Sequence, residues 1–312
     1  MGNDMMADIS KRSARNALAL GMLGFLGATC GAADAAVRID GQVQAGGGAV
    51  AGSTVTLWAG SVGEPKQLAQ AKTSDDGSFA INADATPGPD VSLYLVAKGG
   101  VPSVNKSAAD NPALAFLAVL GGAPPAHVTV NEMTTVASVW TNAQFLDGAA
   151  IKGPALSLSI AAGNVHNFVD LTTGGYGATI ADGLNSTQTP TLANFATLAD
   201  VLAGCAARVK ADACDSLFAA VTSPEGKAPA ETLAAAESIA RAPWRNPEKI
   251  FALLESFYPV PDPRTALRAA PFMPYLSFAP SAWVLPLKFS GGGLSGGGKL
   301  MFDSQGQCLG RR

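Results

Sequence analysis

The sequence predicts an α+β protein of several domains: a β-sandwich, then an all-α domain, then a short β segment. Residues 37–105 alternate apolar and polar positions between glycine-containing turns, which is typical of half-buried strands. Residues 110–258 are rich in alanine and carry apolar residues at helical spacing, interrupted by proline and glycine. Of 312 residues, 48% are hydrophobic and 14% charged, a composition that favours packed domains over disorder.

Residues 1–36 have the organisation of an export signal. Basic residues precede a short apolar run at positions 17–30, and small residues at Ala33, Ala35 and Ala36 mark the expected cleavage region. The apolar run is too short to stay in a membrane as an anchor. We therefore expect an exported protein without a transmembrane anchor, in the periplasm, on the outer surface or secreted.

The expected strands of residues 37–105 follow one another with hairpin turns between them. Glycines at 46–48 and the Asp-Gly pair at 76–77 are typical turn residues. The strands are expected at Val37–Val43, Ser53–Trp58, Ser78–Ile81 and Val91–Ala97.

The order of these motifs carries a family resemblance. Gly-x-Val at 41–43, Val-x-Leu at 55–57 and Asp-Gly-x-Phe-x-Ile at 76–81 resemble the carboxypeptidase-regulatory-like, prealbumin-like sandwich domains of exported bacterial proteins. The resemblance implies a non-catalytic spacer or an adhesion module. Carbohydrate binding would use exposed aromatic rings, for which Trp58 and Tyr94 are the candidates, and burial of both rings would count against it.

The expected helices of residues 110–258 are bounded by capping and breaking residues. Asn111-Pro112 opens the first, and Thr129 with Glu132 has the spacing of a capping box for the second. The helices are expected at 112–120, 130–145, 156–169, 191–205, 212–221, 229–240 and 247–257.

The cysteines indicate one local disulfide. Cys205 and Cys214 are close in sequence, and in an oxidising compartment such a pair is expected to be bonded. The alternative, two ligands of a metal site, lacks a nearby histidine or third cysteine. Cys30 leaves with the signal, and Cys308 remains unpaired.

Residues 259–282 form a proline-rich linker that is expected to lie along a neighbouring surface, and residues 283–312 have strand patterns at 283–289 and 300–303. The glycine-rich stretch from Leu287 to Gln307 resembles the first blade of an NHL-repeat or streptogramin-lyase-like β-propeller. The resemblance implies an incomplete blade, because strands too few to close a ring remain. Suitable codons for residues 308–312, shifted by one base, read Val-Trp-Val-Gly. A frameshift that truncates a propeller-bearing protein is the resulting hypothesis.

No catalytic, cofactor-binding or metal-binding residues are expected. The glycine-rich stretch matches G-x-S-x-G at 293–297 and a phosphate loop at 293–299, but no histidine follows and Leu300 replaces the Ser or Thr that would hold Mg²⁺. His127 with Glu132 is at most half a metal site, and His166 is expected to be a surface or capping residue. The net charge of −3, without a basic stripe, argues against nucleic acid as a partner.

The sequence thus favours a non-catalytic exported scaffold or binding protein, with a cell-envelope protein or carbohydrate as possible partner. One alternative is a propeller lyase or hydrolase in a full-length form, of which this product would be inactive. A further alternative is a carbohydrate-binding adhesion module.

Overall fold

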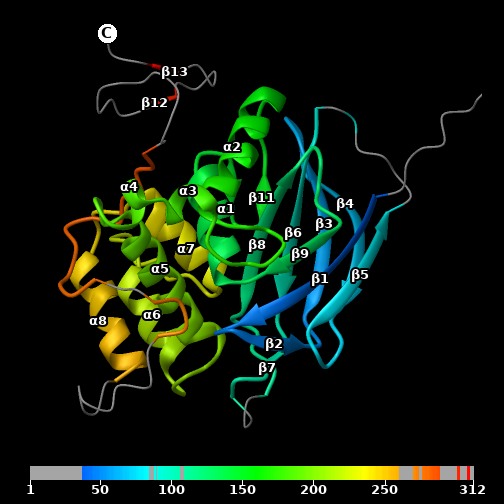
Figure 1. Cartoon of the computed structure of the whole chain (residues 1–312). Coiled ribbons are helices and arrows are strands. Elements are labelled where there is room, and N and C mark those ends of the chain that lie inside the picture. The colour runs from blue at the N-terminus through cyan, green and yellow to red at the C-terminus, as the bar shows by residue number, and fades with distance from the viewer. Residues whose placement is uncertain are drawn as a thin grey trace, which may run out of the picture. The chain divides into compact units, whose positions relative to one another are not determined.

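The computed structural model describes residues 37–83, 88, 90–105, 109–259, 270–273 and 276–288, and the backbone of residues 301–302 and 308–309. It is an α+β protein in which antiparallel sheets pack beside helices (Figure 1). The expected signal region, with Ala33, Ala35 and Ala36, lies outside the described residues. Among the helices that are described, none is both long and apolar enough to cross a membrane.

The first sheet is built around β1 (Val37–Ala45), whose side chains are buried at alternate positions. β5 (Ser78–Ala83) and β2 (Gly48–Ala51) pair with it antiparallel, and β7 (Val101–Pro102) pairs with β2. The fifth strand, β9 (His127–Val130), runs parallel to β1. The long β1 therefore joins neighbours that are far apart in sequence.

The second sheet has the order β4-β3-β6-β8 with every pair antiparallel. β3 (Thr54–Gly60) and β6 (Ser92–Lys98) are central, and β4 (Lys66–Lys72) forms an exposed edge with a lysine at each end. Charged residues on an edge discourage pairing with other chains. The opposite edge is β8 (Ala115–Gly121), which is buried along its whole length.

The helix expected at 112–120 is wrong, because this stretch is strand β8. A short run that is apolar at every position has no period, so its pattern does not separate a buried strand from a buried helix. β9, within the second expected helix and its approach, was likewise missed. The expected boundary at residues 105–110 therefore does not separate sheet from helices, because both sheets take a strand from beyond it.

The outer edge of β8 is closed by helix hydroxyls instead of a further strand. Alternate N–H groups donate to side-chain oxygens: Ala115 to Thr232 at 3.0 Å, Leu117 to Thr135 at 3.0 Å, and Val119 to Ser138 at 2.9 Å. Buried N–H groups without partners are costly, so these hydroxyls make the buried edge possible.

α1 (Glu132–Asn142) follows β9 directly and supplies two of those hydroxyls. Its capping box is formed by Asn131 and Thr134, which exchange side-chain and backbone hydrogen bonds. The expected capping pair of Thr129 and Glu132 is wrong, because Thr129 belongs to β9 and Glu132 is already the first helical residue.

The later helices agree more closely with the sequence. The expected helices at 156–169, 191–205, 212–221 and 247–257 are present within a residue or two at each end, and the helix expected from residue 229 begins at Thr232. These expected helices are α2 (Ala155–Phe168), α5 (Thr191–Ala206), α6 (Ala213–Val221), α7 (Thr232–Arg241) and α8 (Pro247–Phe257). Two short helices, α3 (Ala178–Ala181) and α4 (Gly183–Ser186), were not expected. Two further antiparallel pairs are short: β10 (Leu146–Asp147) with β11 (Ala150–Ile151), and β12 (Met301–Phe302) with β13 (Cys308–Leu309). Val169 and Tyr176 form an isolated antiparallel bridge.

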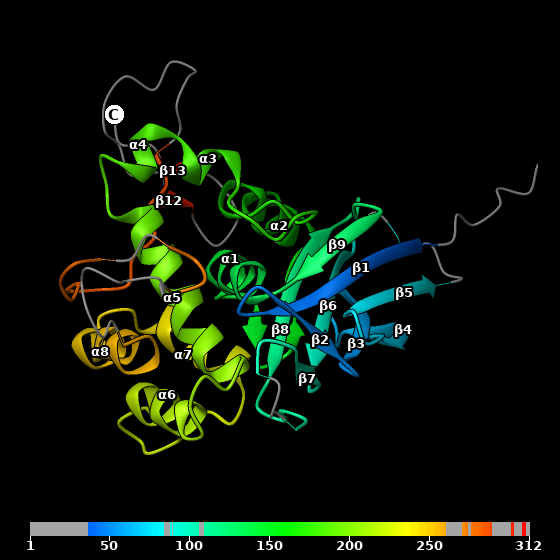
Figure 2. The ribbon, with the colours of Figure 1, turned by 60° about the horizontal axis from the view of Figure 1, so that its bottom comes forward.

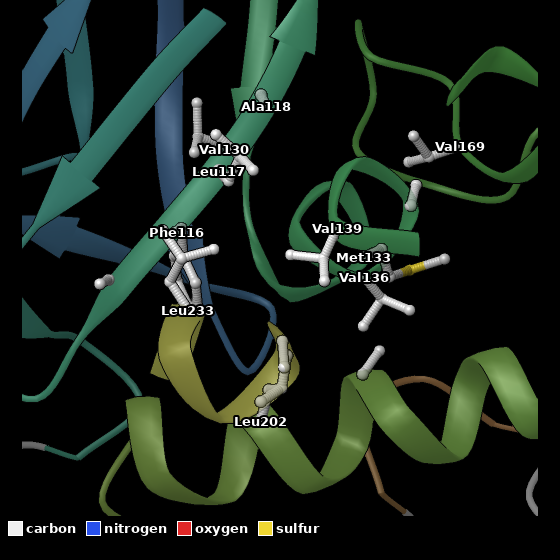
Figure 3. Close-up of a cluster of buried hydrophobic side chains, with 14 of the residues drawn as sticks. Phe116, Leu117, Ala118, Val130, Met133, Val136, Val139, Val169, Leu202 and Leu233 are labelled. Atoms are coloured by element: carbon white, nitrogen blue, oxygen red, sulfur yellow. The ribbon is translucent and has the colours of Figure 1, made fainter. Parts of the chain in front are cut away.

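Sheet and helices share one buried apolar core. Phe116 and Leu117 of β8 face Val136 and Val139 of α1, and Leu202 of α5 belongs to the same cluster (Figure 3). α1 thus packs on β8 with one part of its surface and on α5 with another. Figure 2 shows the ribbon of Figure 1 from a second direction, with α1 between the sheets and α5.

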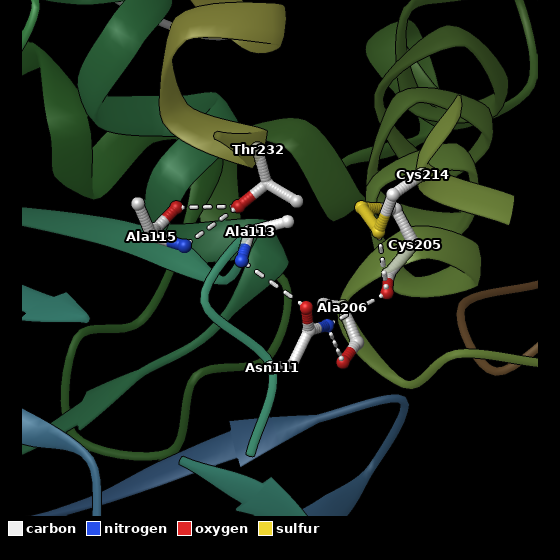
Figure 4. Close-up of a disulfide and its surroundings, with 7 residues drawn as sticks. All are labelled: Asn111, Ala113, Ala115, Cys205, Ala206, Cys214 and Thr232. Atoms are coloured by element: carbon white, nitrogen blue, oxygen red, sulfur yellow. Dashed lines mark hydrogen bonds between the residues drawn. A yellow bond between two sulfur atoms is a disulfide. The ribbon is translucent and has the colours of Figure 1, made fainter. Parts of the chain in front are cut away.

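Cys205 and Cys214 form a disulfide, as their spacing predicts, with Cα atoms 4.4 Å apart. The bond ties the end of α5 to the start of α6. Beside it the buried Asn111 donates to the carbonyls of Cys205 and Ala206 at 3.0 and 2.9 Å (Figure 4). This asparagine fastens the end of α5 to the chain that enters β8.

Candidate functional site

Residues 281–288, which we call the docked segment, lie extended against the helices. Side chains at alternate positions point inward: Trp283 is 0% exposed and Leu285 is 8% exposed, whereas Val284 between them is 51% exposed. The strand expected at 283–289 is not formed at residues 283–288, which keep the alternation of a strand in their burial but pair with no other strand of the described chain. Phe289 lies outside the described residues.

Side chains of α4 and α5 bind the backbone of the docked segment at every second residue. Asn194 donates to the carbonyl of Val284 at 3.2 Å, and Thr191 to that of Pro286 at 2.8 Å. In an extended chain the N–H and C=O of one residue point to the same side. The carbonyl of Pro286 faces α5, and because proline has no N–H, no backbone donor at this position needs a partner.

The last described residue of the segment is held at both of its backbone groups. Asn185 of α4 donates to the carbonyl of Lys288 at 2.6 Å and accepts from its N–H at 2.6 Å. At the other end, Trp140 of α1 donates to the carbonyl of Trp283 at 3.3 Å, and the N–H of Trp283 donates to Pro243 at 2.8 Å. These side chains together form the surface, which we call the groove, that binds the main chain of the docked segment.

A second attachment holds residues 270–273. Asp200 of α5 accepts a hydrogen bond from the N–H of Phe272 at 2.7 Å. The hydroxyl of Tyr176 donates to the carbonyl of Met273 at 2.7 Å, and that of Tyr258 donates to the backbone carbonyl of Asp200 at 3.2 Å. Two side chains, those of Asp200 and Tyr176, therefore bind the backbone of this stretch, whereas Tyr258 binds the backbone of α5.

Asp200 is a buried acid with no basic partner among the described residues. Its side chain is inaccessible to solvent, and its second oxygen, Oδ2, lacks a hydrogen-bond partner within the described chain. Burial raises the pKa of Asp200 to about 7, against the opposing effect of the Phe272 N–H. The carboxyl is therefore neutral in mildly acidic solution and becomes charged near neutral pH.

Glu132, the first residue of α1, is the second buried acid. Its Oε1 accepts from the N–H of Gly46 at 2.9 Å, which joins the turn after β1 to the start of α1. Burial raises the pKa of Glu132 to about 8, and the nearby charge of Asp200 adds to the rise. The two acids can hold protons near neutral pH, but each is enclosed and each serves as an acceptor for a backbone N–H.

A pocket of about 420 Å³ opens beside α8. Its wall has polar as well as apolar surface, and Glu255 is the one carboxylate among the lining residues. The lining residues are Phe251, Leu254, Glu255, Tyr258, Pro259, Ala270, Leu276 and Ser277. The hydroxyl of Tyr258 is engaged by Asp200, so the pocket shows no set of converging ionisable groups among these residues.

The aromatic rings considered for carbohydrate binding are differently placed. Tyr94 is 0% exposed, so the expectation of an exposed Tyr94 is wrong: it points into the core, and burial raises its pKa to about 12. Trp58 is half-buried and stacks on Tyr94, with ring centroids 6.5 Å apart.

The histidine candidates do not assemble a metal site. His127 is exposed at the start of β9, whereas Glu132 is enclosed at the start of α1. Within the described residues, His, Cys, Asp and Glu side chains nowhere form a group of three suited to a metal ion.

Sequence reasoning missed the residues that hold the docked segment. The available signal was polar residues at a three-residue spacing in the otherwise apolar helix α5: Thr191, Asn194, Thr197 and Asp200, all of which are buried. Buried polar groups on a helix need partners from outside the helix. The docked segment supplies partners for Thr191 and Asn194, and Phe272 supplies one for Asp200.

These features define an α+β protein in which helices behind a two-sheet framework bind an extended part of their own chain. Comparison of the chain with protein-family models, curated proteins and solved structures finds no match.

Proposed function

We propose that the protein is a non-catalytic exported scaffold whose folded body fixes the chain at the point where a β-propeller begins. The observation that supports this proposal is the grip of Asn185 on both backbone groups of Lys288. The propeller resemblance starts at Leu287, so the fixed residue lies at the junction. A junction fixed by main-chain hydrogen bonds limits how the following part can rotate about it.

The buried anchor at Trp283 supports the same role. Its indole is fully enclosed, and its backbone is held by Trp140 and Pro243. Burying a large apolar side chain stabilises by about 1.5–3 kcal/mol, and each hydrogen bond adds about 1 kcal/mol, whereas the buried indole N–H, which has no partner in the described chain, offsets part of this gain. The docked segment is thus held strongly enough to act as part of the body instead of a loose linker.

The finer class of the fold and the location are part of the proposal. Two sheets with hairpin connections are consistent with a prealbumin-like sandwich to which helices have been added. The Cys205–Cys214 disulfide is consistent with an oxidising compartment outside the cytoplasm. The partner we propose is a cell-envelope protein, since burial of Tyr94 argues against a carbohydrate platform of Trp58 and Tyr94.

A distance measurement tests whether the junction is fixed. Spin labels would be placed at Gln70 on the exposed strand β4 and at Ser290, with Cys308 replaced by serine. We expect a narrow distance distribution that broadens in Asn185→Ala, while Asn82→Ala, an exposed asparagine on β5, leaves it narrow. A distribution that is already broad in the unchanged protein would refute the scaffold role.

Export is tested separately by cell fractionation and mass measurement. The mature chain should be found outside the cytoplasm and should start near Ala36. Retention of residues 1–36 on a cytoplasmic product would refute this part of the proposal.

A further inference from the structure

We propose that the groove of α4, α5 and Trp140 is a peptide-binding site that also accepts the docked segment of a second copy of this chain. The product would be a segment-exchanged dimer, in which each body holds residues 281–288 of the other. This inference rests on the same docked segment as the proposed function, but it concerns binding between molecules.

The groove binds main-chain atoms, which any extended chain presents. Asn185, Thr191 and Asn194 donate hydrogen bonds to the backbone carbonyls of Lys288, Pro286 and Val284, respectively. None of these hydrogen bonds involves a side chain of the segment. Recognition of alternate main-chain groups together with pockets for alternate side chains is a general way of binding extended peptides.

Selectivity comes from the inward positions. Trp283 and Leu285 are buried, and Leu287 packs against the core, so the segment presents large apolar side chains at every second residue. A second copy carries the same three anchors in the same spacing. It is therefore a ligand that is known to fit the groove.

The connection to the body is long enough for exchange. Residue 273 is held near Asp200 through Tyr176, and the chain from Met273 to Trp283 can span roughly 30 Å when extended. Exchange can thus leave the Asp200–Phe272 attachment in place and still bring Trp283 to a neighbouring molecule.

At low protein concentration, each groove is expected to bind the segment of its own chain and not that of a second copy. A tethered segment has an effective concentration in the millimolar range, so a separate segment at micromolar concentration competes poorly. We therefore expect the unchanged protein to be a monomer when dilute. Exchange becomes visible when the segment of one molecule and the groove of another are weakened.

A complementation experiment with two full-length variants tests the proposal. Trp283→Ala removes the main anchor of the segment and leaves the groove intact. Asn185→Ala combined with Asn194→Ala damages the groove and leaves the segment intact. We expect each variant alone to be a monomer by light scattering, and an equimolar mixture at about 50 μM to form a 1:1 complex of twice the chain mass.

A matched control replaces the exposed neighbour of the anchor. Val284→Ala should keep its own segment docked, since Val284 is 51% exposed, and should form no complex with the groove variant. Absence of a complex between the first two variants, with both folded by circular dichroism, would overturn the proposal. So would a complex that forms equally well with Val284→Ala.

A synthetic peptide of residues 281–288 provides a second test if Trp283→Ala fails to fold. It would be titrated into Leu285→Ala, a milder change of the segment, with fluorescence anisotropy as the readout. We expect saturable binding at least ten times tighter than to the unchanged protein, and loss of binding when Trp and Val are interchanged in the peptide. No binding up to 1 mM, or equal binding of the interchanged peptide, would overturn the proposal. The junction measurement described above stays informative in either case, because it reports on a single molecule.

Discussion

At the scale of single residues, the most unusual feature is the pair of enclosed acids on α1 and α5. Asp200 and Glu132 each accept one backbone N–H, and each has a second oxygen without a partner in the described chain. A carboxylate in such a place is unfavourable, so folding favours the protonated form of both groups. The stability of the protein should depend on pH for this reason.

The free energy of unfolding is predicted to fall as the pH rises. This fall is predicted to be smaller in Asp200→Asn. The folded-state pKa of Asp200 is about 7, above the ordinary value near 4, so the folded state binds more protons between these limits and loses stability as pH rises through them. From pH 4.5 to 8, the free energy of unfolding of the variant should gain about 2–4 kcal/mol relative to the unchanged protein. Urea denaturation at both pH values measures this.

The exposed Asp75 provides the control for that prediction. Asp75→Asn removes an exposed carboxyl from an open turn and is compared with Asp200→Asn at both pH values. The groups whose charges act with Asp200 are Glu132, Tyr176 and Tyr258. If Asp200→Asn follows the pH curve of the unchanged protein, the neutral state of Asp200 is wrong.

At the scale of secondary-structure elements, the sequence predicts those that have a period and misses those that do not. β1 and β5 alternate between buried and more exposed positions, and α6 and α8 have one apolar face, so these four were predictable from their period. β8 is buried on both faces and lacks a period. The docked segment has the alternation of a strand, but its partners are side chains of helices far away in sequence, which no local pattern reveals.

Removal of a hydroxyl that closes the edge of β8 is predicted to lower the free energy of unfolding even when the shape of the side chain is kept. Thr135→Val keeps the side-chain shape but leaves the buried N–H of Leu117 without an acceptor, at a cost of about 1–3 kcal/mol. Thr141→Val on the same helix is the control, because Thr141 is half-buried and returns its hydrogen bond to its own helix. Equal effects of the two changes on the free energy of unfolding would contradict the role of Thr135.

The disulfide is predicted to stabilise the junction of α5 and α6. Reduction should lower the free energy of unfolding by about 2–3 kcal/mol, on the chain-entropy estimate for a short loop. Thermal melting with and without reductant measures the loss. A Cys205→Ala/Cys214→Ala variant should be insensitive to reductant, and a reductant effect of the same size in that variant would assign the loss to another cause.

At the scale of the whole described body, sheets and helices share one core and one set of edge hydrogen bonds. Separate sandwich and helical domains, as the sequence suggests, would each need a core of their own. β8 and α1 belong to both halves of the structure, since β8 completes a sheet and α1 packs on β8 as well as α5.

A single cooperative unfolding transition is therefore predicted. Calorimetry should give one peak whose van't Hoff and calorimetric enthalpies agree, and far-UV and near-UV signals should change together. Two resolved peaks, or helix signal that survives loss of the sheet, would show that the two halves unfold independently.

The parallel pairing of β1 with β9 has a consequence for the order of events during synthesis. β1 meets its antiparallel partners β2 and β5 early, but its parallel partner β9 is made only after some eighty further residues, and contacts of such long sequence range slow folding. Until β9 has been made, the first sheet of the nascent chain is incomplete. For the export that we propose above, late pairing of β9 with β1 is an advantage, because a chain whose first sheet is incomplete passes a narrow translocation channel more easily.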